Sequence, residues 1–300
     1  MRKGLQRIIF AAIVLFMTNS LFPATQSVSA EKQPLEIDLR VMTYNLRYLN
    51  TIDRSPHTWA ERVPAITELI RMEKPDMIGT QEALYQQIQD LTPKLPEYNY
   101  VGLGREGGSK GEYSAIFYRK DRFTPLEYDY YWLSDTPNVI GSKTWGNQIS
   151  RMVTWVKFLD KKSNQKFYAV NAHFDHQSPE ARQKSAALIL EKMKEFDPTL
   201  PVILTGDFNT GPASLPHQIL TQDGAFIDLW DAAQTRVNEN LGTFNAFKDP
   251  AGQGPKRRID WILGKGNILA KTIEILDYQK NGQFPSDHYP VVADLMMRYN

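Results

Sequence analysis

The sequence contains no cysteine in its 300 residues. This absence excludes disulfide bonds, thiol nucleophiles and cysteine-bound metal sites. Basic residues form no long run, the nearest being Lys256-Arg257-Arg258, and no apolar run reaches the roughly 20 residues that a transmembrane helix needs. Hydrophobic residues nevertheless make up 42% of the chain, which is enough for a sizeable core without covalent staples.

The amino-terminal segment has the pattern of an export signal. Three basic residues precede an apolar stretch at 8–17, and Val28-Ser29-Ala30 offers the small residues of a cleavage site. We expect 1–30 to be a signal peptide and the protein to be secreted, extracellular or cell-wall-associated. An uncleaved membrane anchor is the alternative, and no stable anchor is expected after cleavage.

Cleavage would change the charge balance. Loss of three basic residues leaves 32 Lys and Arg against 34 Asp and Glu, a net charge of −2. A chain of this charge has no global positive field that would draw it onto nucleic acid. Nucleic acid is therefore expected only as a substrate, and nothing in the sequence indicates an obligatory protein partner.

Short strands alternate with helices along the rest of the chain. After a polar lead-in at 31–37, no linker, repeat or low-complexity tract interrupts residues 38–300, which predicts a single catalytic domain. Strands outnumber helices and come in pairs, which favours mixed or antiparallel sheets covered by helices. Runs rich in β-branched and aromatic residues predict strands at 41–45, 77–82, 113–119, 152–159, 167–172, 202–205, 258–263, 273–278 and 290–297.

Three stretches show helical signals, and three others are predicted to be long loops that carry function. Helical spacing or capping appears at 59–70, at 84–91 and from Ser178 to about Phe196. The predicted loops, rich in Gly, Pro and Asn, span 102–111, 133–150 and 209–255.

Several predicted strands end in, or lie beside, a polar residue of a restricted type. These residues are Asn45, Glu82, His173, Asp207, Asn209, Asp260, Asp287 and His288. Strand ends at one edge of a sheet can meet in space, and carboxylate and amide oxygens suit Mg²⁺ or Mn²⁺. Each residue alone has an ordinary interpretation as a turn former, helix cap or structural histidine, so the ordered combination carries the argument.

The order of the motifs resembles a known family. The motifs are Thr43-Tyr44-Asn45, Gln81-Glu82, Asn171-Ala172-His173, Gly206-Asp207-Phe208-Asn209, Arg258-Ile259-Asp260-Trp261 and Ser286-Asp287-His288-Tyr289-Pro290-Val291. Together they resemble the DNase I-like endonuclease/exonuclease/phosphatase superfamily over about 38–298. The stretch 132–154 looks closest to a bacterial branch related to deadenylases and nocturnin. The resemblance implies an α/β fold, a four-layer sandwich of two packed mixed β-sheets flanked by helices.

The resemblance also implies a metal site that activates water. Glu82 matches the principal ligand of Mg²⁺ or Mn²⁺, Asn45 a residue that positions metal and phosphate, and Asp287 a second acidic contributor. Asp207 matches the carboxylate that orients and activates the attacking water.

Two histidines complete the implied catalytic set. Asp260 and His288 match a carboxylate–histidine pair, and His173 matches the second catalytic histidine. Both histidines, if cationic, would stabilise the phosphoryl oxygens. Glu112 matches a carboxylate that supports His173.

Three further residues are expected around the phosphate. Asn209 resembles a phosphoryl donor and Arg151 a phosphate-contacting arginine, with a surface arginine as the alternative for the latter. His176 is expected to line the substrate pocket.

These features predict an exported, divalent-metal-dependent phosphoester hydrolase that acts on a small or terminal phosphodiester or phosphomonoester. Candidate substrates are sugar phosphates, nucleotides and cell-wall or lipid head groups. An extracellular nuclease acting on RNA or DNA is the main alternative. A catalytically inactive binding module is the alternative from another class, and it conflicts with the complete set of acidic and histidine positions.

Overall fold

The computed structural model describes residues 35–248 and 254–299, so the predicted signal peptide lies outside the described residues. The strands are β1 (Leu35–Asn45), β2 (Met77–Gln81), β3 (Tyr98–Val101), β4 (Ile116–Arg119), β5 (Phe123–Trp132), β6 (Met152–Asp160), β7 (Gln165–His173), β8 (Val202–Asp207), β9 (Ile227–Asp228), β10 (Thr235–Val237), β11 (Asp260–Lys265), β12 (Ile268–Ile275) and β13 (Val291–Tyr299). The α-helices are α1 (Trp59–Glu73), α2 (Tyr85–Leu91), α3 (Pro179–Lys192), α4 (Leu215–Thr221) and α5 (Leu229–Ala232).

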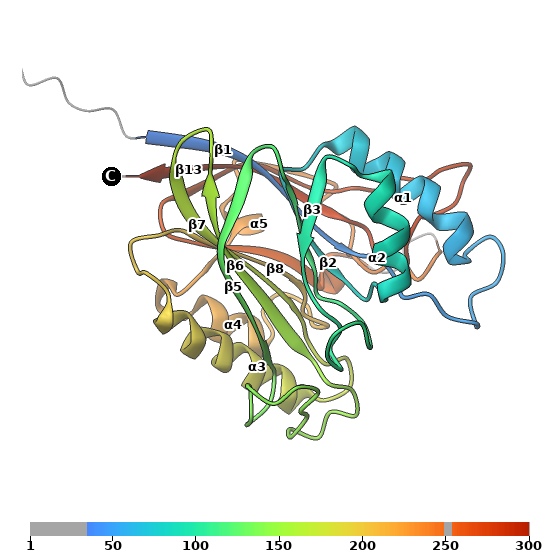
Figure 1. Cartoon of the computed structure of the whole chain (residues 1–300), viewed down its shortest axis with the longest axis horizontal. Coiled ribbons are helices and arrows are strands. Elements are labelled where there is room, and N and C mark those ends of the chain that lie inside the picture. Colours follow the sequence, from blue (N-terminus) through green and yellow to red (C-terminus); the bar gives the residue numbers. More distant parts are fainter. Residues whose placement is uncertain (1–34, 249–253, 300) are drawn as a thin grey trace, which may run out of the picture. The chain divides into compact units, whose positions relative to one another are not determined.

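The strands form two mixed sheets. One has seven strands in the order β10-β12-β13-β1-β2-β4-β3, and the other has six in the order β5-β6-β7-β8-β11-β9. The pairs β1/β2, β10/β12 and β7/β8 are parallel, and the other pairs are antiparallel. Helices α1 and α2 cover the outer face of the first sheet, and α3 and α4 cover that of the second (Figure 1). The predicted four-layer sandwich is confirmed.

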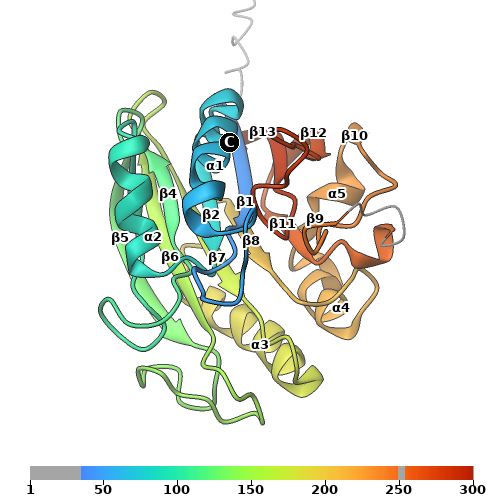
Figure 2. The same ribbon diagram turned by 90° about the vertical axis from the view of Figure 1, so that its right-hand side faces the viewer.

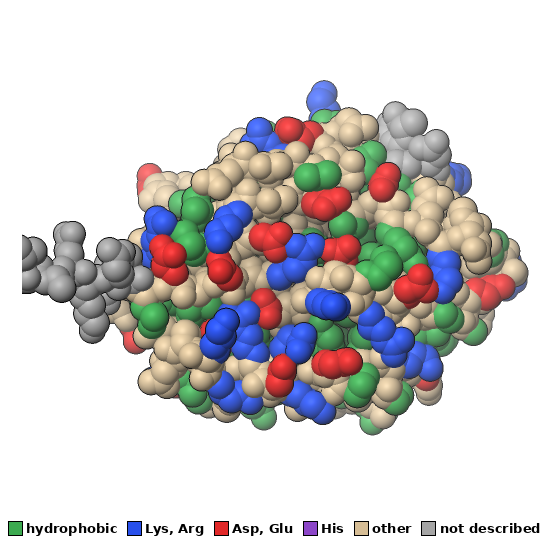
Figure 3. Space-filling model, turned by 90° about the horizontal axis from the view of Figure 1, so that it is seen from above, with side chains coloured by type: hydrophobic (Ala, Val, Ile, Leu, Met, Phe, Trp, Pro, Cys, Tyr) green, Lys and Arg blue, Asp and Glu red, His purple; other side chains and the backbone are tan. Residues whose placement is uncertain are grey.

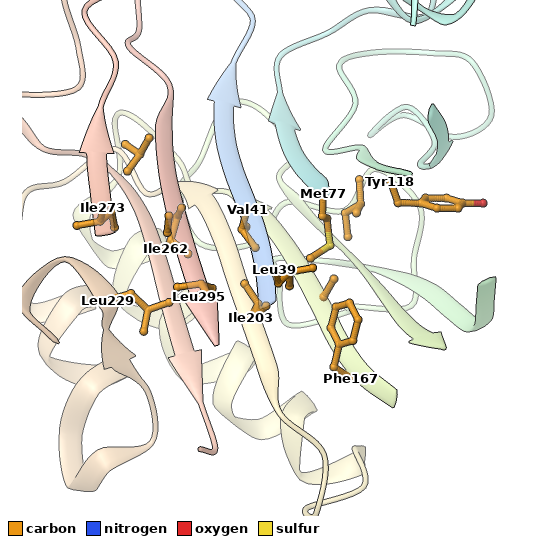
Figure 4. Packing of buried hydrophobic residues seen from close by; sticks show 14 of the residues in the cluster. Leu39, Val41, Met77, Tyr118, Phe167, Ile203, Leu229, Ile262, Ile273 and Leu295 are labelled. Carbon is orange, nitrogen blue, oxygen red and sulfur yellow. The ribbon is translucent and has the colours of Figure 1, made fainter. Parts of the chain in front are cut away.

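Alternation along β1 explains how its sheet serves two cores at once. Leu39 and Val41 point into the core between the sheets, whereas Met42 and Tyr44 pack towards α1. A strand buried on both faces is expected inside a sandwich covered by helices. Figure 4 shows the inner core, where side chains of both sheets meet.

A polar connection joins the two sheets close to the ends of their parallel strands. The Nε2 atom of Gln81 on β2 donates to Oδ1 of Asn171 on β7 at 2.8 Å, and Thr205 Oγ1 on β8 donates to the same oxygen at 3.1 Å. Gly79 leaves room for this contact, because a Cβ there would lie 2.0 Å from Thr205 Oγ1. Strands β1, β2, β7 and β8 therefore lie together in the middle of the sandwich (Figure 2).

Some segment predictions were wrong. The stretch 209–255 is not one long loop, because α4, β9, α5 and β10 lie within it. Strand β5 was not predicted, and β1 begins at Leu35, inside the expected lead-in. Among the described residues, no helix is long and apolar enough to cross a membrane.

Candidate active site

The strand ends bring the predicted polar residues together. Parallel β7 and β8 place His173 opposite Asp207, and antiparallel β11 places Asp260 opposite Asp207 on the other side. In the facing sheet, β1 ends at Asn45 and β2 ends just before Glu82. Residues distant in sequence thus meet where the two sheets join.

Asn45 ties two carboxylates to each other. Its Nδ2 atom donates to Glu82 Oε1 at 3.0 Å and to Asp207 Oδ2 at 2.9 Å, while its Oδ1 accepts from Arg47 N. Glu82 adopts a left-handed backbone conformation with φ of 69°, and its Oε2 accepts from Tyr48 N at 3.2 Å. Such a conformation is costly for a non-glycine residue and occurs often at functional sites.

The donor set fits a divalent cation. One ligand atom each from Glu82, His173 and Asp207 lies within 4.8 Å of the others. Burial and the nearby Asp260 raise the pKa of Asp207 to about 7, and burial, with Glu82 nearby, raises the pKa of Asp287. Crowded, buried carboxylates whose charge is this unfavourable would be stabilised by a bound cation.

Asp260 and His288 form a buried pair. His288 Nδ1 lies 2.9 Å from Asp260 Oδ2, and His288 Nε2 faces Asp207 Oδ2 at 3.8 Å. Burial disfavours the imidazolium, but Asp260 and then Asp207 outweigh it and hold the pKa of His288 well above its usual value. His288 is therefore a cation at neutral pH, with Nδ1–H directed at Asp260.

The structure favours a different charge for the other histidine. Arg151 Nη1 lies 2.9 Å from His173 Nδ1, and Asn209 Nδ2 lies 3.1 Å from His173 Nε2. Burial and then the charges of Arg151 and Arg105 lower the pKa of His173 well below its usual value. These surroundings favour a neutral His173 over the cation considered from the sequence, and the single acceptor nitrogen of a neutral ring can accept from Arg151 or from Asn209.

Glu112 has other partners than the one expected. Its Oε2 lies 2.6 Å from Arg105 Nη1 and 4.0 Å from Arg151 Nη1, so it stabilises two arginines. Its link to His173 is indirect, through Arg151. Burial and the charge of Glu82, partly offset by the arginines, raise the pKa of Glu112 to about 6.

One pocket of about 550 Å³ contains most of these groups. Its lining includes, from the predicted set, Glu82, Glu112, Arg151, His173, His176, Asp207, Asn209, Asp287 and His288. Asn45 and Asp260 lie fully buried beneath it and hold the residues that reach the surface.

Two lining arginines were not recognised in the sequence. Arg47 pairs with Asp53 at 3.0 Å and approaches Asp287 at 3.5 Å. Arg105 comes from the predicted functional loop at 102–111. The only local signal for Arg47 was its position two residues after Asn45. An arginine in a surface loop is too common to indicate a binding site by itself.

Three other residues, His217, Arg182 and Trp145, have structural roles. His217 is buried, with Nε2 2.8 Å from Asp228 Oδ2. Arg182 donates to the carbonyl oxygen of Asp175 at 2.8 Å. Trp145 is buried in the core beneath α3.

The backbone around Thr243 fixes the Asp260–His288 pair. Thr243 Oγ1 accepts from the amides of Ile259 at 2.9 Å and Asp260 at 3.0 Å. Its carbonyl oxygen accepts from Tyr289 N at 2.7 Å, next to a β-bridge between Phe244 and His288. One buried threonine thereby connects the segments that carry both members of the pair.

Replacing Thr243 by valine is expected to lower kcat about 10- to 100-fold, because two buried amides lose their acceptor and the Asp260–His288 geometry loosens. Thr243→Ser keeps the hydroxyl and is the matched control, with kcat near that of the wild type. Steady-state kinetics and thermal melts of both variants provide the measurement. Equal kcat for Thr243→Val and Thr243→Ser would contradict this role.

The sandwich and its carboxylate–histidine site define a DNase I-like protein. The model of the Endonuclease/Exonuclease/phosphatase family matches residues 42–288, and the chain belongs to this family. The family comprises phosphoesterases and nucleases.

Relatives align over almost the whole described chain. An endonuclease/exonuclease/phosphatase family protein of Bacteroides thetaiotaomicron is 36% identical with a TM-score of 0.82, over 87% of this chain and 96% of that one. A mannosyl-6-phosphatase of the same organism is 37% identical with a TM-score of 0.81, over 86% and 99%. An uncharacterized protein of Acanthamoeba polyphaga mimivirus is 33% identical, over 85% of this chain and 98% of its own length.

Proposed function

We propose that this protein is an exported, Mg²⁺- or Mn²⁺-dependent phosphoester hydrolase that acts on a small or terminal phosphoester, with sugar phosphates as the first candidates. The observation that carries the proposal is the convergence of Glu82, Asp207, His173 and His288 in one pocket, with Asp260 buried beneath it against His288. Such a set can bind a divalent ion and hold charges of both signs around one phosphate.

The metal would be held by Glu82, within reach of Asp207 and His173, with Asn45 and Asp287 beside it. When bound, a divalent ion neutralises charge on a non-bridging phosphoryl oxygen and favours departure of the leaving oxygen.

Each protein group then has a definite task. Asp207, fixed by amide donors from Asn45 and Asn209, orients a water molecule for in-line attack and accepts its proton. His288, as a cation, donates to the phosphoryl oxygen on which negative charge develops. Arg151 and Asn209 bind the other phosphoryl oxygens.

The size of the pocket supports a small substrate. A volume of about 550 Å³ falls within the range of sites for small molecules, roughly 300–1,000 Å³. Figure 3 shows one face of the molecule, where Lys and Arg side chains are interspersed with Asp and Glu; it does not show the pocket. The 37% identity to a mannosyl-6-phosphatase favours sugar phosphates among small substrates.

Activity of residues 31–300 is expected with Mg²⁺ or Mn²⁺ on mannose 6-phosphate and on nitrophenyl phosphates. EDTA should lower the rate by at least about 10²-fold, because the metal supplies several kcal/mol of charge stabilisation. Released phosphate and nitrophenol provide the measurement, and added Mg²⁺ should restore the rate.

Other results of the same screen would refute the proposal. Faster degradation of plasmid DNA or total RNA than of any small substrate would identify an extracellular nuclease. If the protein bound substrates but hydrolysed none of them, the catalytically inactive binding module would be the remaining interpretation. Export is tested separately by amino-terminal sequencing of protein recovered from the culture medium, which is expected to begin at Glu31.

A further inference from the structure

One wall of the pocket carries two arginines, Arg105 and Arg151, which we call the two-arginine wall. Glu112 is the carboxylate that bridges them, 2.6 Å from Arg105 and 4.0 Å from Arg151. Asp175 is the other nearby carboxylate, with Oδ2 3.8 Å from Arg151 Nε. Both arginines line the pocket that also contains His173.

Arg151 is a buried cation with unusual partners. Only 5% of it is exposed, and its terminal nitrogens lie at 2.9–3.0 Å from the rings of His173 and His176. Both neighbouring carboxylates stay beyond hydrogen-bond distance of it, and its buried Nε has no hydrogen-bond partner among the described residues. A guanidinium in this situation is stabilised when an anion enters the pocket and accepts from its fork of donors.

Arg105 is held in place by its own loop. The loop is closed by a β-bridge between Gly104 and Tyr113, and Arg105 N donates to Glu112 O at 2.9 Å. Trp132 Nε1 donates to the carbonyl oxygen of Arg105 at 2.6 Å. Arg105 is therefore positioned before a ligand arrives, which lowers the entropic cost of binding.

The space next to the two arginines is small. A small cavity shares Arg105, Glu112, Arg151 and His173 with the pocket, measures about 10 Å³ and is otherwise bounded by Tyr113, Ser114, Ser150 and Met152. Such a volume holds at most about one water molecule. An ester substituent of the phosphate therefore cannot enter this small cavity and has to extend into the main pocket, whose lining also includes Phe244 and Ile259.

We propose that the two-arginine wall binds the terminal oxygens of a phosphate dianion and makes this site selective for phosphomonoesters over phosphodiesters. A monoester presents three terminal oxygens and up to two negative charges, whereas a diester presents two oxygens and one charge. Arg105, Arg151, His176 and Asn209 supply donors on one side of the pocket, which matches the richer acceptor. The inference rests on the proposed function and names Arg105 as the residue that sets selectivity.

The test compares two substrates with the same leaving group. For the wild type with Mg²⁺, kcat/KM is expected to be higher for 4-nitrophenyl phosphate than for ethyl 4-nitrophenyl phosphate. In Arg105→Met the ratio of the two values should fall about 10- to 100-fold, as the loss of a charge-assisted interaction implies. Inhibition by inorganic phosphate should weaken by a similar factor.

Two further variants control for folding and for general charge. Lys110→Met removes a cation from the exposed tip of the same loop, outside the pocket, and should leave the ratio unchanged. Arg105→Lys keeps the charge without the fork, so it should give an intermediate ratio even if Arg105→Met fails to fold. Thermal melts report the folding of each variant.

The outcomes separate this inference from the proposed function. An unchanged ratio in both Arg105 variants, or a wild-type preference for the diester, would overturn the two-arginine wall alone. Absence of metal-dependent hydrolysis of any phosphoester would overturn the proposed function itself.

Discussion

Replacing His288 by alanine is expected to lower kcat about 10³-fold, within the range that a positioned acid or base and a stabilising charge supply. The imidazolium is buried, directed by Asp260 at 2.9 Å, and presents Nε2 to the pocket. Alanine removes the cation and the proton donor together. Steady-state kinetics on the substrate found by the screen, with circular dichroism to verify the fold, provide the measurement.

Asp260→Asn tests the same pair through its pH dependence. Asp260 is the strongest of the groups that raise the pKa of His288 against the opposing effect of burial. In the wild type the imidazolium persists through neutral pH, so the alkaline fall in rate lies above the raised pKa of His288. Without the carboxylate charge the pKa falls, so the alkaline limb of the kcat profile should move to lower pH, with kcat reduced by about 10²- to 10⁴-fold. A wild-type rate in His288→Ala, or an unmoved limb in Asp260→Asn, would refute the charged pair.

Much of the sandwich follows from local sequence. Strands β6, β7 and β8 are dense in β-branched and aromatic residues, and each was predicted within a few residues of its observed bounds. Helix α3 was predicted from Ser178 and Pro179, and the Ser178 side chain accepts from Ala181 N at 3.1 Å, as an N-cap should. These elements can be predicted because the intrinsic preference of their residues and their pattern of burial favour the same secondary structure.

Strand β5 could not be predicted in the same way. It is an edge strand, paired with β6 alone, and its middle residues are exposed. Pro125 precedes a register shift, and Glu127 and Asp129 replace apolar residues in its central part. Prolines, bulges and charges are typical of edge strands, where they discourage further strand pairing. In the sequence alone, the same residues predict a loop.

The site could be predicted in its members but not in its charges. Strand-end positions and motif order indicated Glu82, Asp207, Asp260 and His288, which the structure brings together. The opposite pKa shifts of the two histidines depend on neighbours from other segments: carboxylates surround His288, whereas arginines surround His173. The local sequence around each histidine does not indicate which charged side chains from other segments will lie next to it.

Replacing Glu82 by glutamine is expected to raise the Mg²⁺ concentration for half-maximal activity by at least about 10²-fold, since changes to less direct partners of a metal already cost 10- to 100-fold. The carboxylate of Glu82 accepts from Asn45 Nδ2, which also contacts Asp207, and the residue has a left-handed backbone conformation. Glutamine preserves the shape and removes the charge that a hard cation requires. Activity should fall at low metal and recover in part at high metal.

Glu112→Gln is the matched control, because Glu112 lines the same pocket but its charge is directed at Arg105 and Arg151. Its half-saturating Mg²⁺ concentration should change far less than that of Glu82→Gln, because Glu112 acts on the site only through its charge. Thermal melts with Mn²⁺ give a second readout that needs no substrate: binding to the native state raises the Tm of the wild type and of Glu112→Gln, but little that of Glu82→Gln. If Glu82→Gln and Glu112→Gln had the same half-saturating Mg²⁺ concentration, Glu82 would not be a metal ligand. Asp207 and His173 would then be the remaining groups that could hold the ion.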